Sequence, residues 1–202
     1  DDQKAWLFRT HDGGATWQFI GAGLPPGPAN SIREDPVRPG LLFAGTENGV
    51  WVSFDDGDHW QSLQQNLPRS SMRELKIHEN DLIVATHGRG FWILDDITPL
   101  RQLTPAALKA DAFLFTPAPA WRVRRSLNTD TPLPPDEPLG QNPPDGAVID
   151  YHLARDVAGP LTLERLRDQL SAQEVSLLGP NGQVLLTASR GENFMPERPS
   201  SA

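Results

Sequence analysis

The chain of 202 residues contains no cysteine. Disulfide bonds, thiolate metal sites and a cysteine nucleophile are therefore excluded. Tyrosine occurs once and methionine twice, whereas six tryptophans and eight phenylalanines supply large apolar side chains. Because the hydrophobic fraction is 38%, the chain has enough apolar material for a core, and we expect a folded protein.

Long apolar runs and positive charge are also scarce. No stretch approaches the roughly 18 apolar residues that span a bilayer, and the opening DDQKAWLFRT has no signal-peptide pattern. Lysine and arginine number 18 against 26 aspartates and glutamates, and the net charge of −8 would repel nucleic-acid phosphates. We therefore expect no nucleic-acid partner and no membrane span. We also expect no metal site and no cofactor.

A repeat runs through the first half of the chain. A shift of 43 residues places residues 10–17 on residues 53–60. A shift of 41 residues places residues 41–52 on residues 82–93 without a gap. A period of this length with short β-rich runs is typical of β-propeller blades.

Each repeat is expected to form four short antiparallel strands. In the second repeat the expected strands are residues 41–44, 50–53, 60–63 and 72–78, separated by turn sequences. Parts of three repeats are present, and closed propellers need about four or more blades. We therefore expect the rest of the ring to come from an upstream part of a longer protein or from another chain.

The pattern S/T-x-D-x-G-x-T-W marks one turn of the repeat. The first repeat matches it with Thr10, Asp12, Gly14, Thr16 and Trp17. The second repeat matches it with Ser53, Asp55, Gly57 and Trp60, with His59 in place of the threonine. In the third repeat, residues 94–97 keep two acids but lack the glycine and the tryptophan.

These residue types suit a structural role in a tight turn. The aspartate can accept backbone N–H bonds, and the glycine allows the positive φ that such a turn requires. The tryptophan can bury a large ring between neighbouring sheets. We therefore interpret the matching residues as structural and assign none of them as catalytic.

The pattern resembles the Asp-box (BNR) repeat of sialidases, xyloglucanases, sortilin-type receptors and photosystem assembly factors. Residues 53–68 and 81–100 further resemble large bacterial proteins described as sortilin-like or as glycosyl hydrolases. The resemblance implies a secreted or periplasmic protein whose boxes lie away from the active face. It also implies a proline-rich stretch and a small β-sandwich after the last blade.

Several groups of residues are candidates for a functional site. Asp12 and Asp55 could be paired glycosidase acids, but their turn position gives them a structural task. Asp55 to Asp58 could bind calcium, but the glutamate of a complete calcium loop is missing. His87 and Arg89 lie in a glycine-rich turn, where Arg89 could hold a carboxylate or a sugar hydroxyl, although the glycines can also serve the turn alone.

Proline accumulates in the second half, and the periodicity ends. We expect four segments: propeller blades over 1–98, a proline-rich linker over 99–145, a partial immunoglobulin- or fibronectin-like β-sandwich over 146–190, and a disordered tail over 191–202. Within them we expect a helical turn at 105–110, strands at 112–116, 121–123 and 147–153, and a hairpin of 175–178 with 183–187. Residues 161–173 fit a helix or a strand.

The expected fold class is thus all-β, with a partial β-propeller, a linker and a truncated β-sandwich-like domain. The function that we expect is a propeller scaffold that binds a glycan or a polypeptide, without catalytic residues in this stretch. One alternative is the C-terminal part of a glycoside hydrolase whose acids lie in upstream blades. A second alternative is a protein-docking assembly or sorting factor.

Overall fold

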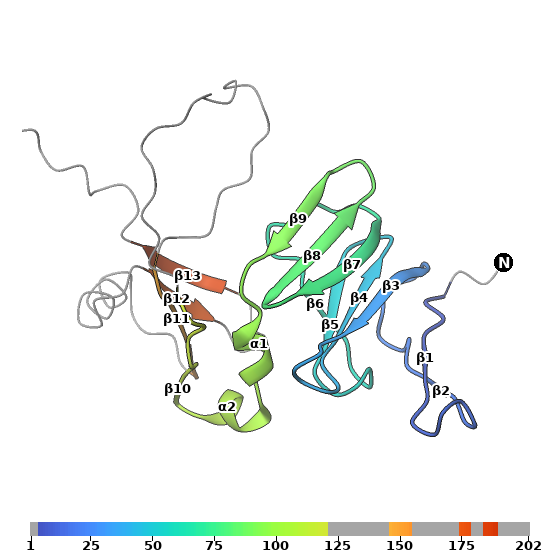
Figure 1. Cartoon of the computed structure of the whole chain (residues 1–202), viewed down its shortest axis with the longest axis horizontal. Coiled ribbons are helices and arrows are strands. Elements are labelled where there is room, and N and C mark those ends of the chain that lie inside the picture. The colour runs from blue at the N-terminus through green and yellow to red at the C-terminus, as the bar shows by residue number, and fades with distance from the viewer. Residues whose placement is uncertain (1–3, 121–145, 155–173, 179–183, 190–202) are drawn as a thin grey trace, which may run out of the picture. The chain divides into compact units, whose positions relative to one another are not determined.

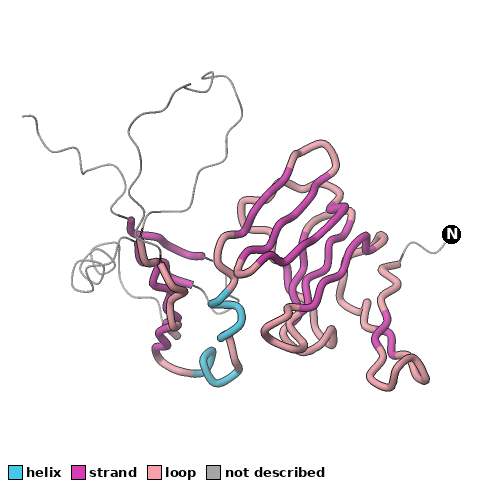
Figure 2. Tube along the Cα trace, viewed as in Figure 1, coloured by secondary structure: helices cyan, strands magenta, loops and turns pink. Residues whose placement is uncertain are grey.

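The computed structural model describes residues 4–120, 146–154, 174–178 and 184–189 (Figure 1). The chain divides between Leu103 and Thr104 into two units, and each is treated by itself below. In the described residues the strands form four sheets, and the helical content is two turns of five residues each (Figure 2). The all-β class expected from the sequence is confirmed.

Three antiparallel sheets make up the first unit. The first sheet pairs β1 (Phe8–Arg9) with β2 (Gln18–Phe19). The second sheet has the order β3 (Ala29–Glu34), β4 (Leu42–Thr46), β5 (Val50–Ser53) and β6 (Gln61–Ser62). The third sheet has the order β7 (Met72–His78), β8 (Asp81–Thr86) and β9 (Phe91–Leu94). Each strand therefore pairs with its neighbour in the chain.

The grouping of strands differs from the expectation in one respect. Residues 72–78 were expected as the fourth strand of the second repeat, but β7 opens the third sheet and β3 opens the second. The reason is a local hairpin: His78 pairs with Asp81 across a two-residue turn in which Glu79 has a φ of 54°. This short connection fixes β7 beside β8.

The gapless alignment of residues 41–52 with residues 82–93 was wrong by one residue. Ala44 pairs with Trp51 in the second sheet, and Val84 pairs with Trp92 in the third. Strand β4 is therefore equivalent to β8 with a shift of 40 residues, and β5 is equivalent to β9 with a shift of 41 residues. The extra residue lies in the turn at residues 87–90, where Gly88 and Gly90 have φ values of 77° and 72°.

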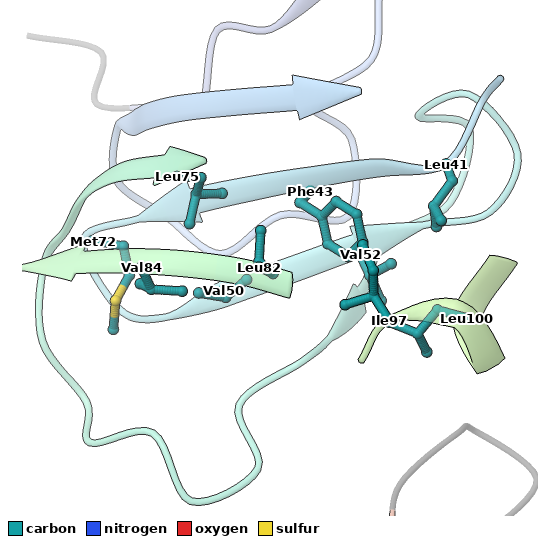
Figure 3. Close-up of a cluster of buried hydrophobic side chains, with 10 residues drawn as sticks. All are labelled: Leu41, Phe43, Val50, Val52, Met72, Leu75, Leu82, Val84, Ile97 and Leu100. Carbon is teal, nitrogen blue, oxygen red and sulfur yellow. The ribbon is translucent and has the colours of Figure 1, made fainter. Parts of the chain in front are cut away.

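The second sheet lies between the other two, and both of its faces are buried. All five residues of β4 are buried, because successive side chains point to opposite faces. One face packs against the third sheet in a cluster of Leu41, Phe43, Val50, Val52, Met72, Leu75, Leu82, Val84, Ile97 and Leu100 (Figure 3). The other face packs against the first sheet in a cluster of Ile20, Leu42, Ala44 and Trp60.

A short helix that the sequence did not predict follows the third sheet. Helix α1 (Thr98–Gln102) begins with Pro99 in its first turn, a position that proline tolerates because its missing N–H has no partner there. Ile97 and Leu100 enter the core beneath it. The chain thus closes one end of the space between the second and third sheets.

The second unit contains α2 (Pro105–Lys109) and one sheet. Its strands are β10 (Ala112–Leu114), β11 (Val148–Leu153), β12 (Glu174–Leu178) and β13 (Val184–Ser189), in that order. The helical turn at 105–110, the strands at 112–116 and 147–153 and the final hairpin are confirmed. β10 lies within the range expected as linker, and it pairs with β11.

The sheet of the second unit is not wholly antiparallel. β11 and β12 pair in parallel, with Tyr151 opposite Leu177. Parallel neighbours need a crossover connection, which a hairpin cannot supply. The expected strand at 121–123, the helix or strand at 161–173 and the tail at 191–202 lie outside the described residues.

Candidate functional site

Residues 10–17, called the first box, form a turn that two side chains hold together. The Thr10 hydroxyl donates to Asp12 Oδ1 at 2.8 Å and accepts from the Gly14 N–H at 2.9 Å. Asp12 accepts from the Thr16 N–H at 2.8 Å and from the Thr16 hydroxyl at 2.6 Å. The carboxylate therefore ties both halves of the turn between β1 and β2.

These hydrogen bonds decide the charge state of Asp12. The side-chain bond from Thr16, followed by the bonds from the Thr16 backbone and the Thr10 hydroxyl, lowers the pKa of Asp12 well below its usual range. A general acid for glycoside cleavage requires the opposite, a carboxyl that stays protonated near neutral pH. Asp12 is therefore poorly suited to acid catalysis.

Residues 53–60, the second box, repeat this arrangement. The Ser53 hydroxyl donates to Asp55 Oδ1 at 2.9 Å and accepts from the Gly57 N–H at 2.8 Å. Asp55 accepts from the His59 N–H at 2.9 Å and lies 2.6 Å from His59 Nδ1. His59 thus takes the place that Thr16 has in the first box.

The substituted histidine gives the second box its own electrostatics. Burial raises the pKa of Asp55, but the hydrogen bonds from His59 and Ser53 outweigh burial, and the net pKa is lowered. The side-chain bond to Asp55 raises the pKa of His59 above its usual value. The opposite shifts of the two pKa values both favour the charged forms that make an ion pair.

The second box is also the contact between the first two sheets. Trp60 Nε1 donates to the Ile20 carbonyl at 2.7 Å. A Cβ built on Gly57, whose φ is 92°, would lie 2.8 Å from Ile20 Cδ1, so only glycine fits there. Arg9 reaches across from β1 and pairs with Asp58 at 2.6 Å and with Asp56 at 3.1 Å.

The two box tryptophans differ in their surroundings. Trp60 is 8% exposed, whereas Trp17 is 62% exposed and donates to Gly14 in its own turn at 3.1 Å. Trp17 directly precedes β2, where the ring of Phe19 meets Trp6 and Phe8 edge-on and Trp6 stacks on Phe8. The expected burial of the ring between sheets therefore holds for Trp60 alone.

Residues 94–97 do not form a third box. Asp96, with a φ of 55°, accepts the Thr98 N–H at 3.0 Å, and the chain continues into α1 instead of a hairpin. Burial and the nearby charge of Asp81 raise the pKa of Asp95. Asp96 therefore contacts the first residue of α1, and neither acid closes a hairpin turn.

A polar network joins the second and third sheets at the ends opposite the boxes. The turn at 47–49 precedes β5 and the second box follows it, so the two lie at opposite ends of that strand. Asn30 donates to Glu47 at 2.8 Å and to Ser71 at 3.2 Å. Arg73 Nη1 lies 3.6 Å from Glu47. The hydrogen bond from Asn30, followed by that from Ser71, lowers the pKa of Glu47 below its usual value.

His87 belongs to this network, and Arg89 lies beside it. Arg73 Nη2 lies 3.3 Å from His87 Nδ1, and the Ser71 carbonyl accepts the His87 N–H at 2.8 Å. Arg89 uses its backbone: its N–H donates to Thr86 at 3.1 Å and its carbonyl accepts from Trp92 at 2.9 Å. Both turn residues are exposed, and the side chain of Arg89 makes no hydrogen bond or ion pair with the described part of the chain.

Sequence reasoning missed a buried ion pair at the other end of the sheets. Asp35 is 2% exposed and accepts two bonds from Arg101 of α1, at 2.8 and 3.0 Å. The Arg101 guanidinium also donates to Asn80 Oδ1 at 2.6 Å. The only sequence signal was an arginine in a stretch read as linker, and no pattern paired it with an acid 66 residues earlier.

Two further properties concern the described residues as a whole. No set of three histidine, aspartate or glutamate side chains within them is arranged to hold a metal ion. None of their helices has the length and hydrophobicity needed to cross a bilayer.

Comparison with known proteins gives one partial similarity. No family model matches the chain. Over 77 residues, or 37% of the chain, it is 30% identical to the vacuolar protein sorting/targeting protein 10 of Pyrenophora teres f. teres (strain 0-1). The match spans 5% of that much longer protein. The similarity fits the sortilin-like part of the resemblance seen in the sequence.

Proposed function

We propose that the first unit forms blades of a β-propeller that binds a polypeptide ligand at the sheet ends opposite the boxes. The observation that carries the proposal is the polar network of Asn30, Glu47, Ser71, Arg73 and His87, which joins two sheets at that end. Loops on a rigid scaffold commonly carry binding groups. The partial similarity to a sorting/targeting protein supports a polypeptide ligand and a secretory compartment.

The exposed arginine beside the network favours a ligand with a carboxylate. Arg73 is paired with Glu47 and lies beside His87, whereas Arg89 extends from the same turn as His87 as an exposed cation. A planar guanidinium binds a carboxylate through two parallel hydrogen bonds. An acidic side chain or a C-terminal carboxylate of an extended peptide could bind Arg89 in this way. The net charge of the protein is −8, so this arginine is a local positive group on a negatively charged protein.

The boxes support the scaffold in this proposal. Each aspartate spends its oxygens on the turn that contains it, and each has a lowered pKa. A glycoside hydrolase would need a carboxyl with a raised pKa and a second acid across the sugar. That alternative therefore places its acids outside the two boxes.

A binding screen with matched variants tests the proposal. The immobilised full chain is offered a peptide library and a panel of glycans and glycosides. We expect an acidic peptide to bind, and binding to fall at least tenfold in Arg89→Ala. Lys76→Ala is the control, because it removes a positive charge from an exposed position of β7 outside the turns at 47–49 and 87–90.

The outcomes separate the candidate functions. Peptide binding that survives Arg89→Ala would contradict the proposed location. Turnover of a glycoside would replace the proposal by the hydrolase alternative. A double variant, Asp12→Asn with Asp55→Asn, should melt at a lower temperature and bind as the parent does below that temperature.

A further inference from the structure

An apolar pocket lies between the second and third sheets. Its apolar lining includes Val50, Leu63, Leu67, Leu82, Val84 and Trp92, and the polar residues Gln64, Gln65 and Asn66 line it as well. Val50 comes from β5 of the second sheet, and Leu82, Val84 and Trp92 come from the third sheet. Leu63 and Leu67 come from the segment after β6. The pocket therefore borders β9, the last strand of the third sheet.

The same lining occurs between the first and second sheets, where a tryptophan fills the space. Trp60 packs there with Leu7, Ile20, Leu24, Leu42, Ala44 and Trp51. In this order these six residues correspond to the six apolar pocket residues named above; Ile32 also belongs to the cluster, and five further residues line the pocket. Equivalent backbone hydrogen bonds support this correspondence. The Ile20 N–H donates to the Leu7 carbonyl at 2.9 Å, and the Leu63 N–H donates to the Val50 carbonyl at 2.9 Å.

The pocket has no counterpart of Trp60 among the described residues. In the second repeat the chain passes from β5 through the second box and supplies the ring. In the third repeat residues 94–97 lack the glycine and the tryptophan, and the chain turns into α1. The space that the indole fills between the first two sheets is therefore left open between the next two.

The strand that follows the tryptophan is missing in the same place. β6 pairs with β5 directly after Trp60, with Gln61 opposite Val52. β9 corresponds to β5, and in the described part of the chain it pairs with β8 alone. Phe91 and Ile93 of β9 are 79% and 56% exposed because no described sheet covers their face, whereas their counterparts Val50 and Val52 pack against the third sheet; these exposures therefore describe the face of β9 and not its edge.

We propose that β9 and this pocket accept an outer strand from a partner polypeptide that carries tryptophan. The indole enters the pocket, and the residues after it pair antiparallel with the edge of β9 that no described strand covers. The indole N–H donates to the Leu63 carbonyl, as Trp60 donates to Ile20 at 2.7 Å. Strand addition supplies main-chain hydrogen bonds, and the pocket selects the side chain. The inference does not depend on the ligand site proposed above.

A cysteine-free chain allows the pairing to be trapped as a disulfide. The probe is the octapeptide GDHWQSLQ, which reproduces residues 57–64. The peptide carries Gln61→Cys and the full chain carries Ile93→Cys, because these positions correspond to the pair of Gln61 and Val52. Residues directly opposite in an antiparallel pair have Cα atoms about 4.5 to 5.5 Å apart, within disulfide range. The chain also carries Trp121→Phe. This change removes the one tryptophan that follows β9 in the sequence, so that only the peptide supplies an indole after that strand.

The controls test place, register and side chain separately. A chain with Val37→Cys offers an exposed thiol away from β9, since Val37 is 64% exposed. A peptide with Gln64→Cys moves the thiol out of register. We expect the disulfide yield of the matched pair to exceed both controls at least tenfold, and to fall at least tenfold when the peptide carries Trp60→Ala.

Equal yields for the two chain positions, or a yield indifferent to the tryptophan, would overturn the proposal. A small thiol reagent reports whether the cysteine at position 93 is accessible. An accessible thiol that traps no peptide contradicts the inference. A thiol protected in the free chain also contradicts it, because the edge would then be covered already.

Discussion

The substitution Gly57→Ala tests whether the first two sheets stack as the structure shows. The added Cβ would lie 2.8 Å from Ile20 Cδ1 and 3.0 Å from Ile20 Cβ, at a φ of 92°. A left-handed backbone costs a residue other than glycine about 1–2 kcal/mol. Overpacking a filled site costs about 1–3 kcal/mol more. We therefore expect Gly57→Ala to lower the free energy of unfolding by about 2–5 kcal/mol.

Gly14→Ala is the matched control in the first box. Gly14 has a similar φ of 96°, but the nearest atom to its added Cβ is Trp17 Cζ2 at 3.7 Å, an ordinary contact. Only the backbone cost of about 1–2 kcal/mol is expected there. Urea denaturation of the full chain, followed by tryptophan fluorescence, measures both changes.

A double-mutant cycle with Ile20→Val makes the test independent of local fraying. Removing Cδ1 should relieve part of the clash at Gly57→Ala, giving a coupling energy of about 1 kcal/mol or more. The same change should not couple to Gly14→Ala. Equal losses for the two alanine variants with no coupling to Ile20→Val would refute the stacking of the second box on Ile20.

Three further predictions concern single features. Because the folded pKa of His59 is raised, the stability from its pair with Asp55 is full below the unfolded pKa of about 6.5 and is lost as pH rises through the folded pKa. The melting temperature of the parent should therefore fall from pH 6 to pH 8.5, and that of His59→Thr should fall less. An equal fall in both proteins would contradict this. Arg101→Met should cost about 3–5 kcal/mol in urea denaturation, because it leaves Asp35 charged and buried; a loss below about 1 kcal/mol would show that the pair is dispensable. Trp60→Phe should destabilise by about 1–3 kcal/mol because the Ile20 carbonyl loses its donor, whereas Trp17→Phe should change stability by less than about 0.5 kcal/mol in the same assay; equal effects would mean that the two rings are equally covered.

The repeat pattern predicted the local turns better than the assembly of the sheets. Spacing alone placed Thr10 with Gly14, and Ser53 with Gly57, in turns where the structure finds matching hydrogen bonds. Such contacts lie within four residues, so local sequence specifies them. The grouping of residues 72–78 failed because a linear period does not state where one sheet ends and the next begins.

Long-range features were out of reach for a different reason. Asp35 and Arg101 meet only after two sheets and a helix have packed, and neither residue has a distinctive neighbourhood in the sequence. The one-residue difference in the turn at 87–90 was hidden because glycine-rich sequences align with or without a gap. Trp60 is buried because the first sheet packs against the second box, and Trp17 is exposed in the described structure; the two similar motifs do not encode this difference.

Hydrogen–deuterium exchange on the full chain, bound to the acidic peptide selected by the screen, tests the functional proposal most directly. We expect the peptide to slow amide exchange at residues 71–73 and 86–90, around Arg73, His87 and Arg89. Exchange in the two boxes, at residues 10–17 and 53–60, should stay unchanged. Protection confined to the boxes would contradict the proposal that they hold the scaffold while the opposite end binds the ligand.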